Sequence, residues 1–197
     1  SDATPRLLKE LHAAEPCAHF ARLSRNFGKE AAMSAGLKLA RGRAVVVIDA
    51  DLQDPPELIG RMLAAWRGGA DVVNMRRRVR AGENWFKLAT AHAFYRAINR
   101  LSDVPIPENV GDFRLLSRRA VDALNQLPER NRFMKGLFAW IGYAQATLDY
   151  DRQPRAAGRT KWRYWKLWNL ALEGITGFST APLKLATYAG LASAAGA

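Results

Sequence analysis

The sequence of 197 residues has few side chains suited to disulfide or zinc chemistry, with one cysteine, Cys17, and three histidines. One cysteine cannot form an internal disulfide, and together with scattered histidines it does not make a zinc site. We therefore expect a reducing, cytosol-facing environment. Internal repeats and low-complexity segments are also absent from the sequence.

Acidic residues are scarce relative to basic ones, since 18 Asp and Glu stand against 30 Lys and Arg and leave a net charge of +12. The hydrophobic content of 49% is that of a globular protein and excludes disorder as the main state. Polyanions or anionic membranes are predicted partners. The basic excess lies in two clusters: Arg76, Arg77, Arg78 and Arg80, and Arg152, Arg155, Arg159, Lys161, Arg163 and Lys166.

Long hydrophobic runs are missing as well. The apolar stretch from Leu185 to Ala197 has 13 residues, whereas a helix needs about 20 to cross a bilayer. It is compatible with the first part of a membrane helix and with a surface helix, and the residues alone favour neither. The N-terminal residues contain no charged segment followed by an apolar one, so no signal peptide is expected.

Strand-like and helix-like segments alternate along the chain. Apolar, β-branched runs predict buried strands at 44–48 and 71–75. Shorter strands are predicted at 18–23, 112–116 and 146–150, and helices at 4–11, 30–39, 56–68, 85–101, 117–127 and 132–141. This order predicts an α/β layer fold with a largely parallel sheet.

The buried strand at 44–48 leads directly into Asp49 and Asp51. Open α/β sheets bind ligands at the carboxyl ends of their strands, and alternate residues of an extended chain can point the same way. Two converging carboxylates suit Mg²⁺ or Mn²⁺ that also binds substrate phosphates. The alternative is a strand-end turn in which Asp54 and Pro55 cap the next helix. A second acid pair, Asp149 and Asp151, lacks such a run and is assigned to a strand edge or solvated turn.

Tryptophans and basic residues alternate in the segment from Lys161 to Ile175. Helical spacing places Trp162, Trp165, Trp168 and Leu172 near one face, flanked by Arg163 and Lys166. The pattern fits a helix lying at a membrane interface, a buried core helix, or a surface that stacks on single-stranded nucleic acid.

Three segments together resemble a known family. They are Ser24-Arg25-Asn26-Phe27-Gly28-Lys29-Glu30, Asp49-Ala50-Asp51-Leu52-Gln53-Asp54-Pro55-Pro56-Glu57 and Gly111-Asp112-Phe113-Arg114-Leu115. They are similar to family 2 glycosyltransferases that charge polyprenyl phosphates, a group that includes dolichol-phosphate mannose synthase and undecaprenyl-phosphate transferases. The resemblance implies a GT-A fold with a Rossmann-like, mostly parallel sheet. It also implies a divalent Mg or Mn ion and inverting transfer of a sugar from a nucleotide-diphospho-sugar to a polyprenyl phosphate.

The resemblance also implies roles for individual residues. Asp49 and Asp51 match the metal motif and Gln53 its sugar-diphosphate side, whereas Asn26 and Gly28 match a loop beside the donor. Asp112 matches the catalytic carboxylate, and Arg114 a nearby phosphate or structural partner. Arg76 or Arg77, with Lys87 or Thr90, match the positions that hold the lipid phosphate.

The role of Asp112 depends on the acceptor. A phosphate monoester with a second pKa near 6 is mostly dianionic at pH 7, so its oxygen scarcely needs a general base. Asp112 could then orient a sugar hydroxyl or the acceptor, or hold Arg114. The alternative is a purely structural strand-to-helix transition with Ser117.

The family pattern divides the chain into three parts. Residues 1–157 are expected to form a catalytic domain without the first strand and base-binding turn of the family, so we expect an exposed sheet edge and weak donor binding. Residues 158–177 are expected to form the interfacial helix, and residues 178–197 the start of a truncated transmembrane segment. The expected partners are a UDP- or GDP-linked sugar, a polyprenyl phosphate and the cytoplasmic face of a membrane, most simply the bacterial inner membrane. No nucleic acid is expected, and a homo-oligomer is left open.

Two other functions remain as alternatives. A family 2 enzyme that extends a polysaccharide would need Asp112 as a true base, and its activity would not depend on a lipid phosphate. A noncatalytic basic module that binds membranes or nucleic acid would show no metal-dependent transfer from a sugar nucleotide.

Overall fold

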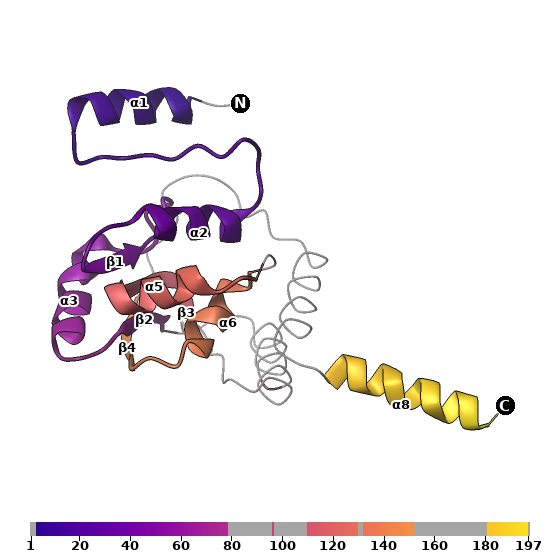
Figure 1. The fold of residues 1–197 in the computed structure, drawn as a ribbon. Coiled ribbons are helices and arrows are strands. Elements are labelled where there is room, and N and C mark those ends of the chain that lie inside the picture. The colour runs from indigo at the N-terminus through magenta and orange to yellow at the C-terminus, as the bar shows by residue number, and fades with distance from the viewer. Residues whose placement is uncertain (1–2, 79–95, 97–109, 130–131, 152–180, 197) are drawn as a thin grey trace. The chain divides into compact units, whose positions relative to one another are not determined.

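The computed structural model describes residues 3–78, 96, 110–129, 132–151 and 181–196 (Figure 1). The chain divides into two compact units, residues 1–40 and 41–197. The predicted interfacial helix at 158–177 lies outside the described residues, as does the predicted helix at 85–101 except for Arg96.

The first unit contains two helices, α1 (Thr4–Ala14) and α2 (Lys29–Leu39). Pro5 lies in the first turn of α1, where its missing N–H removes no helical hydrogen bond. The strand predicted at 18–23 is wrong, because these residues are irregular and mostly exposed. A short segment forms a stable strand only where a neighbouring strand pairs with it.

The second unit contains a sheet of four strands among its described residues: β1 (Ala44–Val47), β2 (Val72–Arg77), β3 (Val110–Ser117) and β4 (Gln145–Tyr150). Their order is β1-β3-β2-β4. β2 and β4 are parallel, whereas β3 runs antiparallel to both β1 and β2. The expectation of a mostly parallel sheet is therefore wrong at β3, since a buried apolar strand has the same sequence pattern in either direction.

Among the described residues of this unit, one 3-10 helix and four α-helices accompany the strands. The segment after β1 begins with the 3-10 helix η1 (Pro56–Leu58) and continues as α3 (Ile59–Arg67). The helix α5 (Arg118–Gln126) follows β3, and its N-cap, Ser117, accepts a hydrogen bond from the Ala120 N–H. The remaining two are α6 (Met134–Trp140) and α8 (Ala181–Ala195). The helices predicted at 56–68, 117–127 and 132–141 are thus confirmed with boundaries shifted by a few residues.

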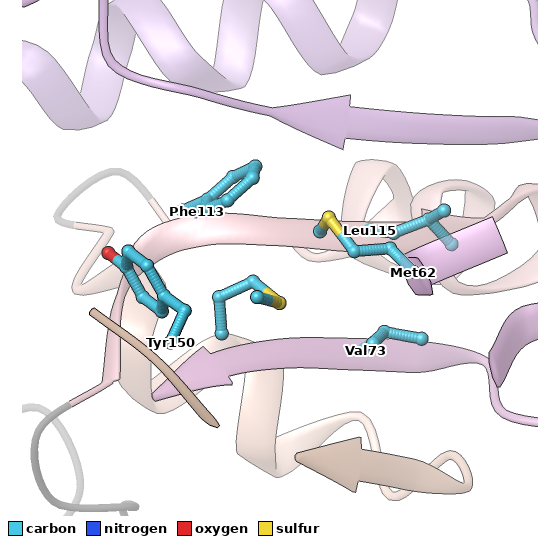
Figure 2. Packing of buried hydrophobic residues seen from close by; sticks show 6 residues of the cluster. Met62, Val73, Phe113, Leu115 and Tyr150 are labelled. Atoms are coloured by element: carbon cyan, nitrogen blue, oxygen red, sulfur yellow. The ribbon is translucent and has the colours of Figure 1, made fainter. Parts of the chain in front are cut away.

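The core lies between the sheet and α3. Met62 from α3 packs with side chains of β2, β3 and β4, which are Val73, Met75, Phe113, Leu115 and Tyr150 (Figure 2). Arg114 alternates with Phe113 and Leu115 along β3 and stacks on Phe138 of α6, so α6 covers the opposite face. Helices on both faces of the sheet make a three-layer arrangement.

The start of β3 is irregular. Asn74 pairs with Arg114 and Arg76 pairs with Val110, so a step of two residues along β2 corresponds to four along β3. The extra residues form a bulge at Gly111, Asp112 and Phe113. Bulges bend a strand and redirect its side chains, and they are common beside active sites.

Within the part of the chain that the structure describes, no helix has both the length and the apolar character needed to cross a bilayer. The longest of the described helices, α8, has 15 residues.

Candidate functional site

Four chain segments meet at one edge of the sheet, here called the carboxyl edge. β1, β2 and β4 run in one direction and end there, while β3 runs in the opposite direction and begins there. Val47, the last residue of β1, pairs with Arg114, and Arg76 near the end of β2 pairs with Val110. The acidic motif after β1 and the arginines of β2 therefore share this edge.

The segment from Asp49 to Asp54, here called the motif loop, turns sharply after β1. The Gln53 N–H donates to Asp51 Oδ1 at 3.2 Å. Leu52 between them has a φ of 58°, in the left-handed region that non-glycine residues rarely adopt, and its side chain is 65% exposed. Asp49, Asp51 and Gln53 are partly exposed. A strained loop that presents carboxylates at a strand end is typical of a functional site.

The chemistry of the motif loop fits a hard divalent cation. The described residues contain no cluster of three or more His, Cys, Asp or Glu side chains that could hold a metal by themselves. Mg²⁺ usually binds through one or two carboxylates and completes its coordination with water and substrate phosphates. The carboxylates of Asp49 and Asp51 are of the type that could hold such an ion.

Asp54, the last residue of the motif loop, does not take the helix-capping position that the alternative interpretation gave it. The N-cap of η1 is Pro55. Asp54 is only 1% exposed, and its Oδ1 accepts a hydrogen bond from the hydroxyl of Tyr150 at the end of β4. Asp54 thus connects the motif loop after β1 to the end of β4, the strand at the opposite border of the sheet.

The arginines that follow one another in β2 have different environments. Arg76 makes two hydrogen bonds to Asp149 in β4, at 2.6 and 3.1 Å. This pairing lowers the pKa of Asp149 and raises the pKa of Arg76. Arg78 Nη1 lies 3.9 Å from Asp151 Oδ2, which makes an ion pair. The second acid pair is therefore part of a strand end and its ion pairs, as the sequence interpretation has it.

Arg77 faces the buried side of the carboxyl edge. Its Nε donates to the Tyr150 hydroxyl at 3.3 Å. A Cβ atom added at Gly111 would lie 2.7 Å from Arg77 Nη2, so a larger residue at this position would force the guanidinium to move. Arg77 is thereby held between the end of β4 and the bulge that contains Asp112.

The bulge itself is supported by Arg114. This side chain is 2% exposed, donates from Nη2 to the Gly111 carbonyl oxygen at 2.7 Å, and stacks on the Phe138 ring at 3.8 Å. Asp112 is partly exposed within the bulge. Through these contacts Arg114 supports the bulge, and a role toward a phosphate stays a prediction.

The other predicted site residues lie elsewhere in the chain. In the first unit, Asn26 Oδ1 accepts a hydrogen bond from the Gly28 N–H at 2.9 Å, and Gly28 has a φ of 91°. These two residues shape the turn before α2. Lys87 and Thr90 lie outside the described residues.

Sequence reasoning missed three contributors to the carboxyl edge. Asp54 and Gly111 lie in motifs that were recognised, but their contacts depend on residues far away in the chain. Tyr150 lies between two acids in an ordinary strand-end pattern, and no local signal distinguishes it.

Comparison with known proteins identifies the class to which this fold and site belong. The family described as glycosyl transferase family 2 matches residues 1–124. The chain therefore belongs to glycosyl transferase family 2.

Individual relatives extend the similarity to almost the whole chain. A protein of Synechocystis sp. (strain ATCC 27184 / PCC 6803 / Kazusa), named as an uncharacterized glycosyltransferase, is 54% identical over 189 residues, which cover 96% of this chain and 59% of that protein. The prophage bactoprenol glucosyl transferase homolog of Escherichia coli (strain K12) is 48% identical over 190 residues, covering 96% and 62%. A bactoprenol glucosyl transferase of Shigella phage SfX has the same identity and coverage. The chain thus spans about three-fifths of the length of these curated relatives.

Proposed function

We propose that the protein transfers a sugar from a nucleotide-diphospho-sugar to a polyprenyl phosphate, with inversion at the sugar carbon. The observation that carries the proposal is the meeting of the acidic motif loop and Arg77 at the carboxyl edge of the sheet. The carboxylates of the motif loop suit a metal-bound diphosphate, and the Arg77 guanidinium suits a second anion. The names of the two bactoprenol glucosyl relatives make glucose the first sugar to test.

The reaction joins two anions, so charge neutralisation is the main requirement. In the proposed reaction an oxygen of the lipid phosphate bonds to the anomeric carbon, while the bond from that carbon to the diphosphate oxygen breaks and releases a nucleoside diphosphate. Asp49 and Asp51 would hold Mg²⁺ or Mn²⁺, which when bound offsets the charge on the departing diphosphate. Arg77 would bind the lipid phosphate, for which guanidinium geometry is well suited.

Asp112 has a positioning role in this proposal. Because the acceptor phosphate is already mostly ionised at pH 7, little is gained by removing a proton from it. Asp112 lies in the bulge at the carboxyl edge and is partly exposed, and in this proposal it would orient a sugar hydroxyl.

The decisive experiment uses the full-length protein in membranes, a panel of UDP- and GDP-linked sugars, and undecaprenyl phosphate. We expect a glycosyl phospholipid product that requires both the lipid phosphate and a divalent cation. Transfer to a polysaccharide without lipid phosphate would replace the proposal with the polymer-extending alternative. Absence of transfer and of donor hydrolysis across the panel would favour a noncatalytic module.

The proposed location is the cytoplasmic face of a membrane, and it rests on the sequence from Lys161 to Ile175, which lies outside the described residues. Replacing Trp165 and Trp168 with Ser should weaken cosedimentation with anionic liposomes, because Trp side chains favour the membrane interface. Unchanged cosedimentation would instead favour the alternative that this segment is a buried core helix.

A further inference from the structure

The hydroxyl group of Tyr150 contacts both the motif loop and Arg77 at the carboxyl edge. Tyr150 is 3% exposed, and its ring packs in the core against Phe113 with ring centroids 5.8 Å apart. Figure 2 shows the ring at one end of the cluster, with the hydroxyl oxygen pointing away from the other labelled side chains. Packing of the ring in the core therefore fixes the position of the Tyr150 hydroxyl oxygen.

That hydroxyl serves two charged side chains at once. It donates to Asp54 Oδ1 of the motif loop and accepts from Arg77 Nε at 3.3 Å. Burial, aided by the hydrogen bond to Asp54, raises the pKa of Tyr150 to about 12. The phenol is consequently neutral at physiological pH and keeps the proton that it donates to Asp54.

Arg77 is confined from a second direction. Its guanidinium lies over the Cα of Gly111, where an added Cβ would approach Nη2 to 2.7 Å. The tyrosine hydroxyl and the glycine together limit where the guanidinium can lie. A long side chain at a strand end would otherwise sample several rotamers and lose more entropy on binding an anion.

We propose that Tyr150 is a positioning residue that holds Arg77 and the motif loop in fixed relation, so that an anionic acceptor and a metal-bound diphosphate meet at one edge. The inference deepens the proposed function and rests on it. Tyr150 touches neither substrate in this account, and it acts through Arg77 on the acceptor side and through Asp54 on the donor side.

The test compares Tyr150→Phe with wild type in the full-length protein, using undecaprenyl phosphate and the sugar nucleotide that wild type accepts. This change removes the hydroxyl and keeps the ring, so the core contact with Phe113 remains. We expect the KM for lipid phosphate to rise about tenfold, as for loss of a hydrogen bond to a charged group. Tyr143→Phe is the control for loss of a tyrosine hydroxyl, because Tyr143, which is partly buried, lies near Arg119 rather than at the motif loop.

A double-mutant cycle separates positioning from a general structural effect. If Tyr150 acts through Arg77, adding Tyr150→Phe to Arg77→Ala should change the KM for lipid phosphate less than twofold further. An unchanged KM in the single Tyr150→Phe variant, or effects that are fully additive in the cycle, would overturn the inference. Thermal unfolding of each variant shows whether the compared proteins are equally folded.

A second variant tests the confinement of Arg77 from the side of the bulge. Gly111→Ala should displace the Arg77 guanidinium and raise the KM for lipid phosphate, again with little added effect in the Arg77→Ala background. A normal KM in this variant would contradict the inference, even if Tyr150→Phe proved unstable. Failure of wild type to use lipid phosphate would instead defeat the proposed function, so the two failures are distinguishable.

Discussion

The two ends of the sheet both contain buried or partly buried carboxylates, yet their environments differ. At the end opposite the carboxyl edge, Asp71 precedes β2 and is 4% exposed. Its carboxylate accepts hydrogen bonds from the Ser117 hydroxyl and from two nitrogens of Arg119. At the carboxyl edge, Asp49 and Asp51 are partly exposed on a loop with a strained residue.

The difference separates the structural role of Asp71 from the metal-binding role that we propose for Asp49 and Asp51. Asp71 joins the start of β2 to the end of β3, and the Ser117 N–H donates to the Asp71 carbonyl oxygen at 2.7 Å. The Arg119 hydrogen bonds, the largest cause, lower the pKa of Asp71. A carboxylate satisfied in this way stabilises the native state, whereas the role that we propose for Asp49 and Asp51 is to bind a metal ion.

The largest expected effect is on activity at the carboxyl edge. Asp51→Asn in the full-length protein should reduce sugar transfer at least 100-fold, because an amide is a weaker ligand for a hard cation. The melting temperature should change little. Transfer assays and thermal unfolding measure the two quantities. If wild type keeps its full transfer rate in excess chelator, the proposed metal dependence is wrong.

The corresponding change at the other end should affect stability instead. Asp71→Ala removes hydrogen bonds to Ser117 and Arg119 and should lower the free energy of unfolding by about 2 kcal/mol. Because folding lowers this pKa, the contribution is present above the ordinary value near 3.8 and is lost as the pH falls below it. Denaturant titrations between pH 7 and pH 3 should show the variant and wild type converging in acid. A constant difference across that range would show that the carboxylate charge is not responsible.

The two neighbouring arginines sharpen the comparison within one strand. Arg77→Ala should raise the KM for lipid phosphate about tenfold, whereas Arg76→Ala should have a smaller effect because Arg76 is paired with Asp149. The KM for the sugar nucleotide should move less than the KM for the acceptor in both variants. Steady-state kinetics with each substrate varied in turn would measure this, and equal effects of the two variants would assign the acceptor to the whole cluster.

The smallest expected effect concerns the cap of α5. Ser117→Ala removes the hydrogen bond from the Ala120 N–H and the one to Asp71, and should lower the free energy of unfolding by about 1 kcal/mol. Kinetic parameters measured well below the melting temperature should match wild type. A change in KM would connect this end of the sheet to the site and weaken the distinction between the two ends.

Local sequence determined the elements and the principal motif of this protein. The strand predicted at 44–48 is found as β1 and the helix predicted at 117–127 as α5, and Asp49 and Asp51 follow a strand as the motif requires. These features depend on residues that are neighbours in the chain. Backbone geometry and the spacing of apolar side chains suffice to predict them.

Tertiary structure alone decided the direction of β3, the bulge at Gly111 and the convergence of Asp54, Arg77 and Tyr150. The Tyr150 hydroxyl and Asp54 are 96 residues apart in the chain. Their contact depends on which strands pair and in which register. A single local sequence does not encode that choice, because apolar strands of either direction bury the same side chains, and the free energy that selects one pairing comes from packing across the whole sheet.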